Sequence, residues 1–168
     1  RWNTIKFSLW KEINMLLGMS KPLDKRLNSI CGKLSKFIED LACSIYVFNE
    51  DTQMLHLKAS SLVDMKAVGS FAINKGEGID GWVANTGKGV ILADKENPVD
   101  EIRKIYFSLP MMAEGKVAGV ISGQLVSSKG LLPHQESFLK EISVPIAETI
   151  NSHQKQERQF LKSNKMIA

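Results

Sequence analysis

Closely spaced glycines are the first feature of this sequence that could do chemistry. Residues 76–81 read G-E-G-I-D-G, the G-x-G-x-x-G spacing of phosphate-binding loops, and Val83 extends the match to the kinase form. A dinucleotide-binding fold needs a full crossover helix after its glycines, whereas Gly87 ends this helix pattern early. Glu77 and Asp80 also place two carboxylates where a phosphate would lie, and V-A-I-K, H-R-D and D-F-G do not occur. These points argue against both phosphate-binding classes.

Other residue types that can do chemistry are scattered along the chain. They include His56, His134, His153, Cys31 and Cys43. The histidines show no metal-ligand spacing, and the two cysteines are expected to be small buried side chains rather than reactive thiols or a disulfide. Glu77 and Asp94 could form a carboxylate pair for acid–base chemistry, but the ends of a short helix and of a strand explain them more simply. Trp82 is either a core residue or a stacking face for a ligand.

The glycines belong to a strand–turn–helix–strand unit. Residues 70–73 lead in as a strand, residues 79–83 follow a short helical pattern, and residues 90–92 form a second strand. Gly87 stands where a helix C′ glycine belongs, and the glycines before the helix permit positive φ or close backbone approach. The unit predicts one wall of a compact pocket.

The whole stretch resembles the GAF domain family. That family carries G-E-G-[IL]-x-G-x-[VA]-x-x-[TG]-G and then a strand ending in Asp, and residues 76–87 followed by 90–94 keep that order and spacing. A first hairpin of the type S-I-Y-V-F, turn, L-x-L-x-A lies at residues 44–59. A last hairpin similar to V-P-L…G-x-V-x-G-V-L lies at residues 109–121. The resemblance covers about residues 23–150.

The resemblance implies an α+β fold: an antiparallel sheet of about six strands, with N- and C-terminal helices packed on one face and the glycine stretch forming a pocket on the other. Pro110 is expected to interrupt a strand over residues 105–112. The predicted sheet core comprises Ile45, Val47, Leu55, Leu57, Val120 and Ile121, covered by Leu27, Leu34 and Ile38. The expected organisation is an N-terminal helix at 1–19, a GAF domain at 20–151, and a helical extension at 152–168 toward an output domain.

GAF domains as a class bind small molecules, or bind nothing and dimerise. The ligand site expected here is lined by Ile73, Trp82, Ile91, Asp94, Phe107 and Met111. The cyclic-nucleotide motif N-K-x(n)-F-x3-D-E is broken because Asp100-Glu101 precede Phe107. Bilin attachment needs a cysteine late in the domain, free-methionine-sulfoxide reductases need cysteines around the glycines, and the sequence has neither. Tyr106 stands where the family often has serine. The cofactor is therefore unknown, and no enzyme activity is expected.

The expected function is that of a sensory GAF domain in a larger bacterial signalling protein, which binds an effector and signals through dimeric terminal helices. The output domain could be a histidine kinase of a two-component system, a transcription activator or a cyclic-dinucleotide enzyme. The alternative is a ligand-free dimerisation module. The predicted homodimer interface comprises Leu9, Ile13, Leu16, Leu17, Ile142 and Ile146, and the tail after Asn151 is expected to be loosely held.

Composition sets the remaining limits. The 168 residues are 43% hydrophobic, enough for one domain with a real core, and the chain, which starts at Arg1, is expected to be a piece of a longer protein. No signal peptide or membrane-spanning run occurs in the sequence, and the composition is typical of a cytoplasmic protein. The net charge of +4 comes from residues 1–40 and 151–168, where solvated helix faces explain it better than nucleic-acid binding.

Overall fold

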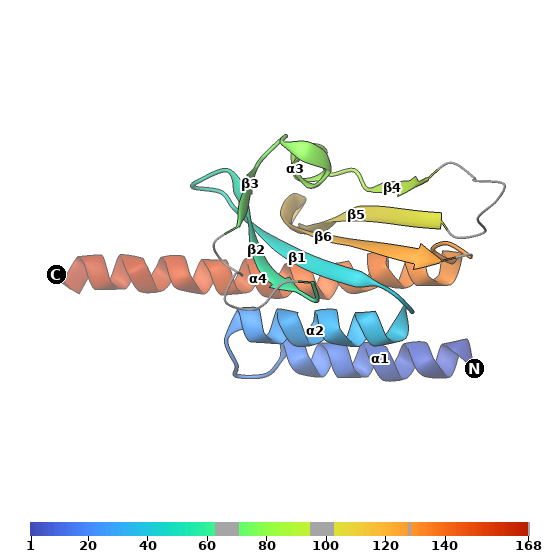
Figure 1. The fold of residues 1–168 in the computed structure, drawn as a ribbon. Helices are drawn as coiled ribbons and strands as arrows, with labels where there is room; N and C mark the ends of the chain where they lie inside the picture. The colour runs from blue at the N-terminus through green and yellow to red at the C-terminus, as the bar shows by residue number, and fades with distance from the viewer. Residues whose placement is uncertain (63–70, 95–102, 128, 168) are drawn as a thin grey trace.

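The computed structural model describes residues 1–62, 71–94, 103–127 and 129–167 (Figure 1). The elements found there are α1 (Trp2–Leu17), α2 (Leu23–Phe37), β1 (Ala42–Asn49), β2 (Met54–Ser60), β3 (Ala72–Asn74), α3 (Gly78–Thr86), β4 (Val90–Ala93), β5 (Arg103–Ala113), β6 (Lys116–Ser127) and α4 (Pro133–Ile167).

A single six-stranded sheet organises this part of the chain. Its strand order is β3-β2-β1-β6-β5-β4, and every neighbouring pair is antiparallel. Helices α2 and α4 pack on one face, α1 packs on those two helices, and α3 lies over the opposite face (Figure 1). We call the side with α1, α2 and α4 the helix face and the side with α3 the concave face. The predicted α+β class, strand number and position of the terminal helices are confirmed.

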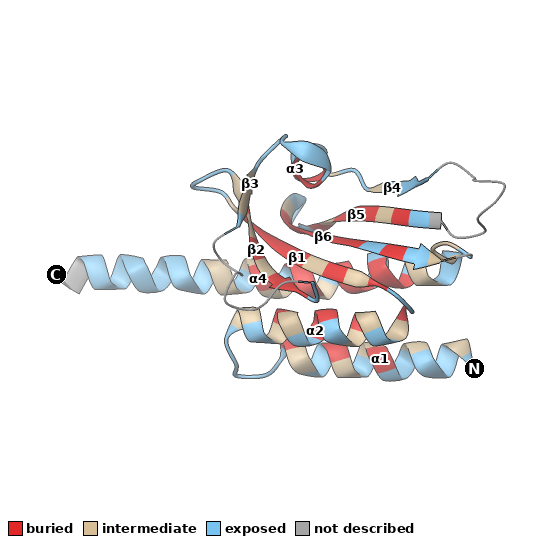
Figure 2. Cartoon of the chain, in the orientation of Figure 1, coloured by how far each residue is buried: buried red, intermediate tan, exposed pale blue. Residues whose placement is uncertain are grey.

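The main core lies between the sheet and the helix face (Figure 2). All nine residues predicted for the sheet core and its cover are buried, at 5% exposure or less. A second, smaller core on the concave face joins Leu55, Leu57 and Val120 to Val83 of α3. The two cores explain why the central strands are apolar on both sides.

A β-bulge divides β2 between the two cores. Ile45 pairs with Ala59, but Tyr46 pairs with Leu57, so Lys58 is the extra residue. Ala59 therefore packs in the helix-face core, whereas Leu55 and Leu57 pack in the concave-face core. Simple alternation predicts one common side for these three residues; the bulge reverses the facing within the strand.

Two glycines of β6 make room for large side chains of β5. Phe107 pairs with Gly123, and Met111 pairs with Gly119. A Cβ on Gly123 would lie 2.7 Å from the Phe107 ring, so that ring occupies the space above the glycine. The space above these glycines is therefore filled by cross-strand neighbours and not by a helix or a ligand. Pro110 does not interrupt β5, because it pairs with Val120 inside one continuous strand.

Helix α1 belongs to the core of the monomer. Leu9 and Leu17 are 8% exposed, Ile13 is fully buried, and all three join α2 and α4 in the helix-face core. At the start of α1, the Trp2 ring stacks on Phe37 at 5.0 Å. The residues predicted for the homodimer interface are therefore not available to a partner, and that prediction is wrong. Five of them are buried within one chain, and Leu16 is partly buried against the same core; the five are Leu9, Ile13, Leu17, Ile142 and Ile146.

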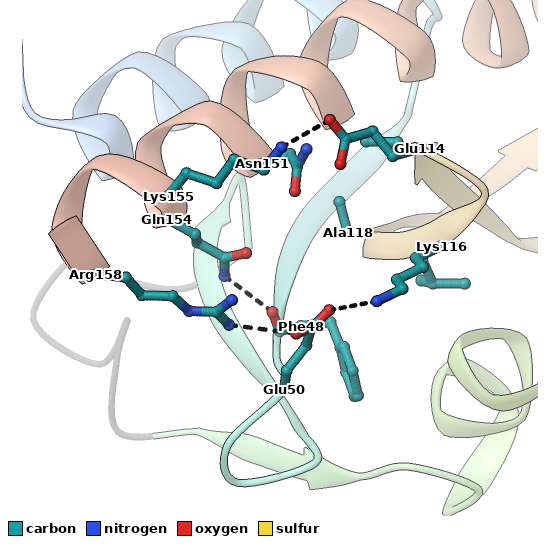
Figure 3. Close-up of a pocket in the computed structure, with 11 residues that line it drawn as sticks. Phe48, Glu50, Glu114, Lys116, Ala118, Asn151, Gln154, Lys155 and Arg158 are labelled. Atoms are coloured by element: carbon teal, nitrogen blue, oxygen red, sulfur yellow. Dashed lines mark hydrogen bonds and ion pairs between the residues drawn. The ribbon is translucent and has the colours of Figure 1, made fainter.

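Helix α4 extends well past the body of the domain, and two hairpin turns hold it where it leaves (Figures 1 and 3). Gln154 Nε2 donates to the carbonyl oxygen of Phe48 at 2.9 Å. Lys155 Nζ lies 2.7 Å from Glu114 Oε1 and lowers the pKa of that carboxyl, and Arg158 lies 3.4 Å from Glu50. The tail after Asn151 is therefore attached for about two turns, contrary to expectation, and its residues beyond Arg158 are exposed up to Lys165.

Removing both hairpin-turn carboxylates should loosen this part of α4 without unfolding the domain. In the double variant Glu50→Gln, Glu114→Gln we expect faster amide hydrogen exchange at residues 155–160 and a nearly unchanged melting temperature, because exposed ion pairs contribute little to global stability. Glu136→Gln is the matched control, since it breaks only an i,i+4 pair with Lys140 at the other end of α4. Unchanged exchange at 155–160 in the double variant would show that the turns do not hold the helix.

Candidate functional site

The glycine stretch folds as a tight loop that leads into α3, which packs on the sheet. Gly76 and Gly78 have φ of 88° and 65°, a region that favours glycine. A Cβ on Gly81 would lie 2.6 Å from the carbonyl oxygen of Asn74, so the backbones approach too closely for a side chain. Glu77 accepts hydrogen bonds from the backbone and side-chain nitrogens of Asn74, both at 3.1 Å. Glu77 therefore closes the loop and does not pair with Asp94.

Helix α3 presents one polar residue to the sheet. Asp80, Val83 and Ala84 are buried on its inner side, whereas Trp82 is 43% exposed and Ile79 39% exposed. The Asp80 side chain is thus carried onto the concave face of the sheet. A carboxylate at 8% exposure needs hydrogen-bond donors to offset the loss of water.

Hydroxyl groups from the sheet supply these donors. Tyr106 Oη donates to Asp80 Oδ1 at 2.7 Å, and Ser108 Oγ donates to the same oxygen at 2.8 Å. Burial, followed by the negative charge of Asp80, raises the pKa of Tyr46 to about 12, which places this third hydroxyl near the carboxylate. Ser122 lies beside Tyr106, whose pKa it lowers slightly against the larger effect of burial and Asp80. We call Asp80, Tyr46, Tyr106, Ser108 and Ser122 the Asp80 cluster.

A row of serines crosses the sheet through this cluster. Ser60 pairs with Ser44, Ser44 with Ser122, and Ser122 with Ser108, so four neighbouring strands each contribute one hydroxyl. The Oγ atoms of Ser44 and Ser60 lie 3.0 Å apart. Ser60, Ser108 and Ser122 are each at most 4% exposed, which is unusual for side chains that could have been apolar. This row, which we call the floor, is therefore polar and rich in hydroxyl groups, whereas Leu55, Leu57 and Val120 make another part of the same face apolar.

The next row along the strands is open. Gln124 pairs with both Ala42 and Tyr106, and Tyr106 pairs with Leu92 of the edge strand β4. Gln124 is exposed, Leu92 is 48% exposed, and Tyr106 and Ala42 are half-buried. Because residues two apart in a strand share a face, this row borders the serine row on the concave face. Tyr106 therefore lies where the buried serine row meets a more exposed row.

The two tyrosines of the chain both lie in this cluster and should titrate together at high pH. An ordinary tyrosine ionises near pH 10, whereas burial raises the pKa of Tyr46 to about 12 and that of Tyr106 further. Near-ultraviolet absorbance should therefore show no tyrosinate in the folded protein at pH 10 to 11. A tyrosine that ionises at about pH 10 before unfolding would contradict the cluster.

The same shift predicts a loss of stability in strong base. The folded state keeps the Tyr46 proton above pH 10 while the unfolded state releases it, so the free energy of unfolding falls as pH rises from about 10 to 12. The loss should be on the order of 2 kcal/mol for Tyr46. It should be absent in Tyr46→Phe, so the difference between wild type and this variant isolates it. Denaturant titrations across this pH range measure it.

The structure does not bring the six predicted ligand residues into one cavity. Phe107 and Met111 are fully buried in the helix-face core, because alternation along β5 puts them on the side opposite Tyr106 and Ser108. Ile73 packs in the concave-face core, so it is on the other side of the sheet. The other three residues are exposed: Ile91 lies on the edge strand β4, Trp82 lies on the outer side of α3, and Asp94 follows β4. The expectation of one shared lining is wrong for this reason.

Sequence reasoning missed the residues that do converge. Asp80 appeared only as an obstacle to phosphate, and Tyr106 only as a departure from a family pattern. A signal was present: Tyr106, Ser108, Ser122 and Ser44 are polar at alternate positions of otherwise apolar strands. Their meeting depends on strand register, which alternation within one strand cannot supply.

Other kinds of site find little support in the described part of the chain. Cys31 and Cys43 are fully buried, and contact with Cys43 together with burial raises the pKa of the Cys31 thiol. Among the described residues no group of three or more histidine, cysteine, aspartate or glutamate side chains could hold a metal ion. Nor does any helix there have the length and apolar character needed to cross a membrane.

Comparison with solved structures gives the fold its name. The GAF domain of the phosphoenolpyruvate-protein phosphotransferase from Acinetobacter superimposes with a TM-score of 0.75 at 22% identity, covering 92% of this chain and 98% of that one. The corresponding domain from Coxiella burnetii gives 0.77 at 19% identity, covering 91% and 96%. The A. aeolicus NLH2 GAF domain in an inactive state gives 0.70 at 19% identity, covering 91% and 99%. No protein-family model and no curated protein sequence matches the chain.

The chain is thus an antiparallel α+β domain with a helix-covered face and a concave face that is partly apolar and partly polar. More particularly, it has the GAF fold.

A type II free methionine-R-sulfoxide reductase from Thermoplasma acidophilum shares this fold with a TM-score of 0.59 at 19% identity, covering 77% of this chain and 92% of that one. Proteins of this fold therefore include an enzyme as well as the GAF domains named above.

Proposed function

We propose that this chain is a non-catalytic sensory module that binds a small polar molecule on the concave face of its sheet. The observation that carries the proposal is the Asp80 cluster. Evolution of a purely structural face would favour apolar side chains at such positions, because buried hydroxyls and a buried carboxylate need partners to offset their desolvation. A polar floor beside an accessible row of residues suits a ligand that makes hydrogen bonds.

The position of the thiols supports a non-catalytic role. Reduction of a sulfoxide, the activity named for some proteins of this fold, could use a reactive thiol at the substrate. Cys31 and Cys43 are buried on the helix face, on the opposite side of the sheet from the Asp80 cluster. A raised thiol pKa also lowers the fraction of nucleophilic thiolate at Cys31.

We propose that α4 carries the signal to an output domain of a larger bacterial, cytoplasmic signalling protein. Its attached turns touch the β1–β2 and β5–β6 hairpin turns, and Phe48, Glu50, Lys116 and Val117 of these hairpins also line a hollow beside α3. A shift of α3 on ligand binding could therefore reach α4 through the hairpin turns. The identity of the output domain stays open.

A homodimer remains part of the proposal, with a different interface from the one predicted. Phe7 and Met15 of α1 and Val144 of α4 are 50% to 66% exposed and are available for a second copy. Sedimentation at high micromolar concentration should show a dimer that Phe7→Glu weakens without changing the fold. A monomeric wild-type chain would remove the dimer and would also weaken the alternative function, a ligand-free interaction module that these exposed side chains favour.

A thermal-shift screen against a metabolite library tests the sensory function. At least one compound should raise the melting temperature of the wild-type protein but not that of Ser122→Val, which removes a hydroxyl from the centre of the floor. Ser127→Val, at the end of the same strand, is the matched control and should respond like the wild type. If every hit also stabilises Ser122→Val, binding lies elsewhere; if the library gives no hit, the interaction module is favoured.

A further inference from the structure

We propose that the Asp80 cluster recognises the hydrogen-bond-donating end of its ligand, with a protonated amine preferred and anions disfavoured. The inference rests on the proposed function, since it names the chemical class of molecule for the same face. It is carried by the donor and acceptor balance of the cluster, by its charge and by the accessible row beside it.

The donor and acceptor balance leaves acceptors available. Both described hydroxyl bonds at Asp80, from Tyr106 and Ser108, go to Oδ1. A carboxylate offers about four acceptor positions on its two oxygens, so Oδ2 can accept from a ligand. A hydroxyl that donates to Asp80 also keeps its own lone pairs. The Tyr106 and Ser108 hydroxyls are thus engaged as donors to Asp80, whereas the carboxylate and the hydroxyl lone pairs remain acceptors for a ligand.

The charge of the cluster points the same way. Burial and Asp80 hold the Tyr46 and Tyr106 hydroxyls in their neutral, protonated form, and the serines are neutral as well. The cluster therefore carries one negative charge, in a partly buried place where charges are poorly screened. A second anion there would be repelled, and a cation would be attracted. Lys104 is exposed at the next concave-face position of β5, so a positive charge lies at the rim rather than at the floor.

The hydrogen bonds of Asp80 could also have a purely structural role, which is to hold α3 on β5. In that case Asp80 would influence stability but not the choice between ligands. The readout must therefore be ligand preference, measured at the site itself.

Matched fragments and amide chemical shifts provide this readout. The probes are 2-phenylethylamine, phenylacetate and phenylacetamide, which share an aromatic skeleton and carry a cation, an anion or a neutral amide. Each is titrated into the labelled protein while the amide signals of Gly78, Gly81, Ser108 and Ser122 are followed. We expect the amine to bind at least tenfold more tightly than the carboxylate at these amides.

Variants assign the preference to the carboxylate. Asp80→Asn keeps the shape and one acceptor but removes the charge, and it should reduce the amine-to-carboxylate ratio to about threefold or less. Asp51→Asn, an exposed turn residue, should keep the wild-type ratio. If Asp80→Asn does not fold, Tyr106→Phe is used: it frees part of Oδ1 and should retain or increase the preference for the amine.

The outcomes separate the two claims. Equal or tighter carboxylate binding at these amides, or an amine preference that survives in Asp80→Asn, overturns the inference and leaves the sensory function standing. No shift at these amides with any probe at millimolar concentration, together with no hit in the metabolite screen, overturns both.

Discussion

Replacing Gly119 with alanine should lower the free energy of unfolding by about 3 kcal/mol or more, a large effect for one methyl group. Gly119 lies on β6 at the centre of the sheet, paired with Val47 on one side and Met111 on the other. A Cβ there would collide with the carbonyl oxygen of Tyr46, which belongs to the backbone of β1, and would lie 2.8 Å from Met111 Cε. The methionine can move, but the carbonyl cannot move without disturbing the pairing of β1 with β6.

Gly32→Ala is the matched control. Gly32 is exposed within α2, and no atom lies within 4 Å of a Cβ built on it. Alanine should therefore stabilise the protein by about 0.5–1 kcal/mol, because glycine is a poor helix residue. Denaturant unfolding of both variants measures the difference. If Gly119→Ala costs less than about 1 kcal/mol, the strands are not as close at this point as the structure has them.

Truncating Ile13 should cost about 2–4 kcal/mol, and the cost should not depend on protein concentration. Ile13 is fully buried where α1 meets the other helices of the helix face. Ile13→Ala therefore leaves a cavity inside one chain. If the α1 stripe were instead covered by a second chain, the cost of Ile13→Ala would fall as the protein concentration rises, because mass action would restore the weakened dimer.

Lys11→Ala serves as the control on the same helix, since Lys11 is exposed and is not one of the side chains proposed for the dimer contact. Its effect on stability should stay within about 0.5 kcal/mol. A near-neutral Ile13→Ala, or a cost that vanishes at high concentration, would show that α1 packs on a partner rather than on its own domain.

Local patterns predicted much of the fold. The spacing of the glycines predicted the turn, the short helix and the strand of residues 76–92, because glycines mark positions of special backbone conformation. Gly87, for example, has the left-handed φ of 69° that is expected after a helix. Alternation predicted the two hairpins, and the periodicity of residues 23–41 predicted the helix that lies on β1 and β2. These features depend on neighbours in sequence.

Features that depend on distant neighbours were not predictable in the same way. The bulge at Lys58 reverses the facing of β2, and nothing in the local pattern marks it. Phe107 and Met111 were assigned to the ligand side, although alternation along β5 puts them on the helix face, where glycines across the strand leave space for them. The apolar side chains of α1 were correctly predicted to be buried, but the sequence could not show whether a partner chain or α2 and α4 bury them. The Asp80 cluster joins α3 to three strands and exists only in the folded register.

Native mass spectrometry of the gently purified protein tests the small-molecule site most directly. The same sample is weighed under native and denaturing conditions, for the wild type and for Ser122→Val. We predict an additional small mass on the native wild-type protein, or one gained on incubation with a metabolite extract, that is lost on denaturation and reduced in Ser122→Val. Identical native and denatured masses throughout, with and without the extract, would contradict a ligand-binding role for the concave face.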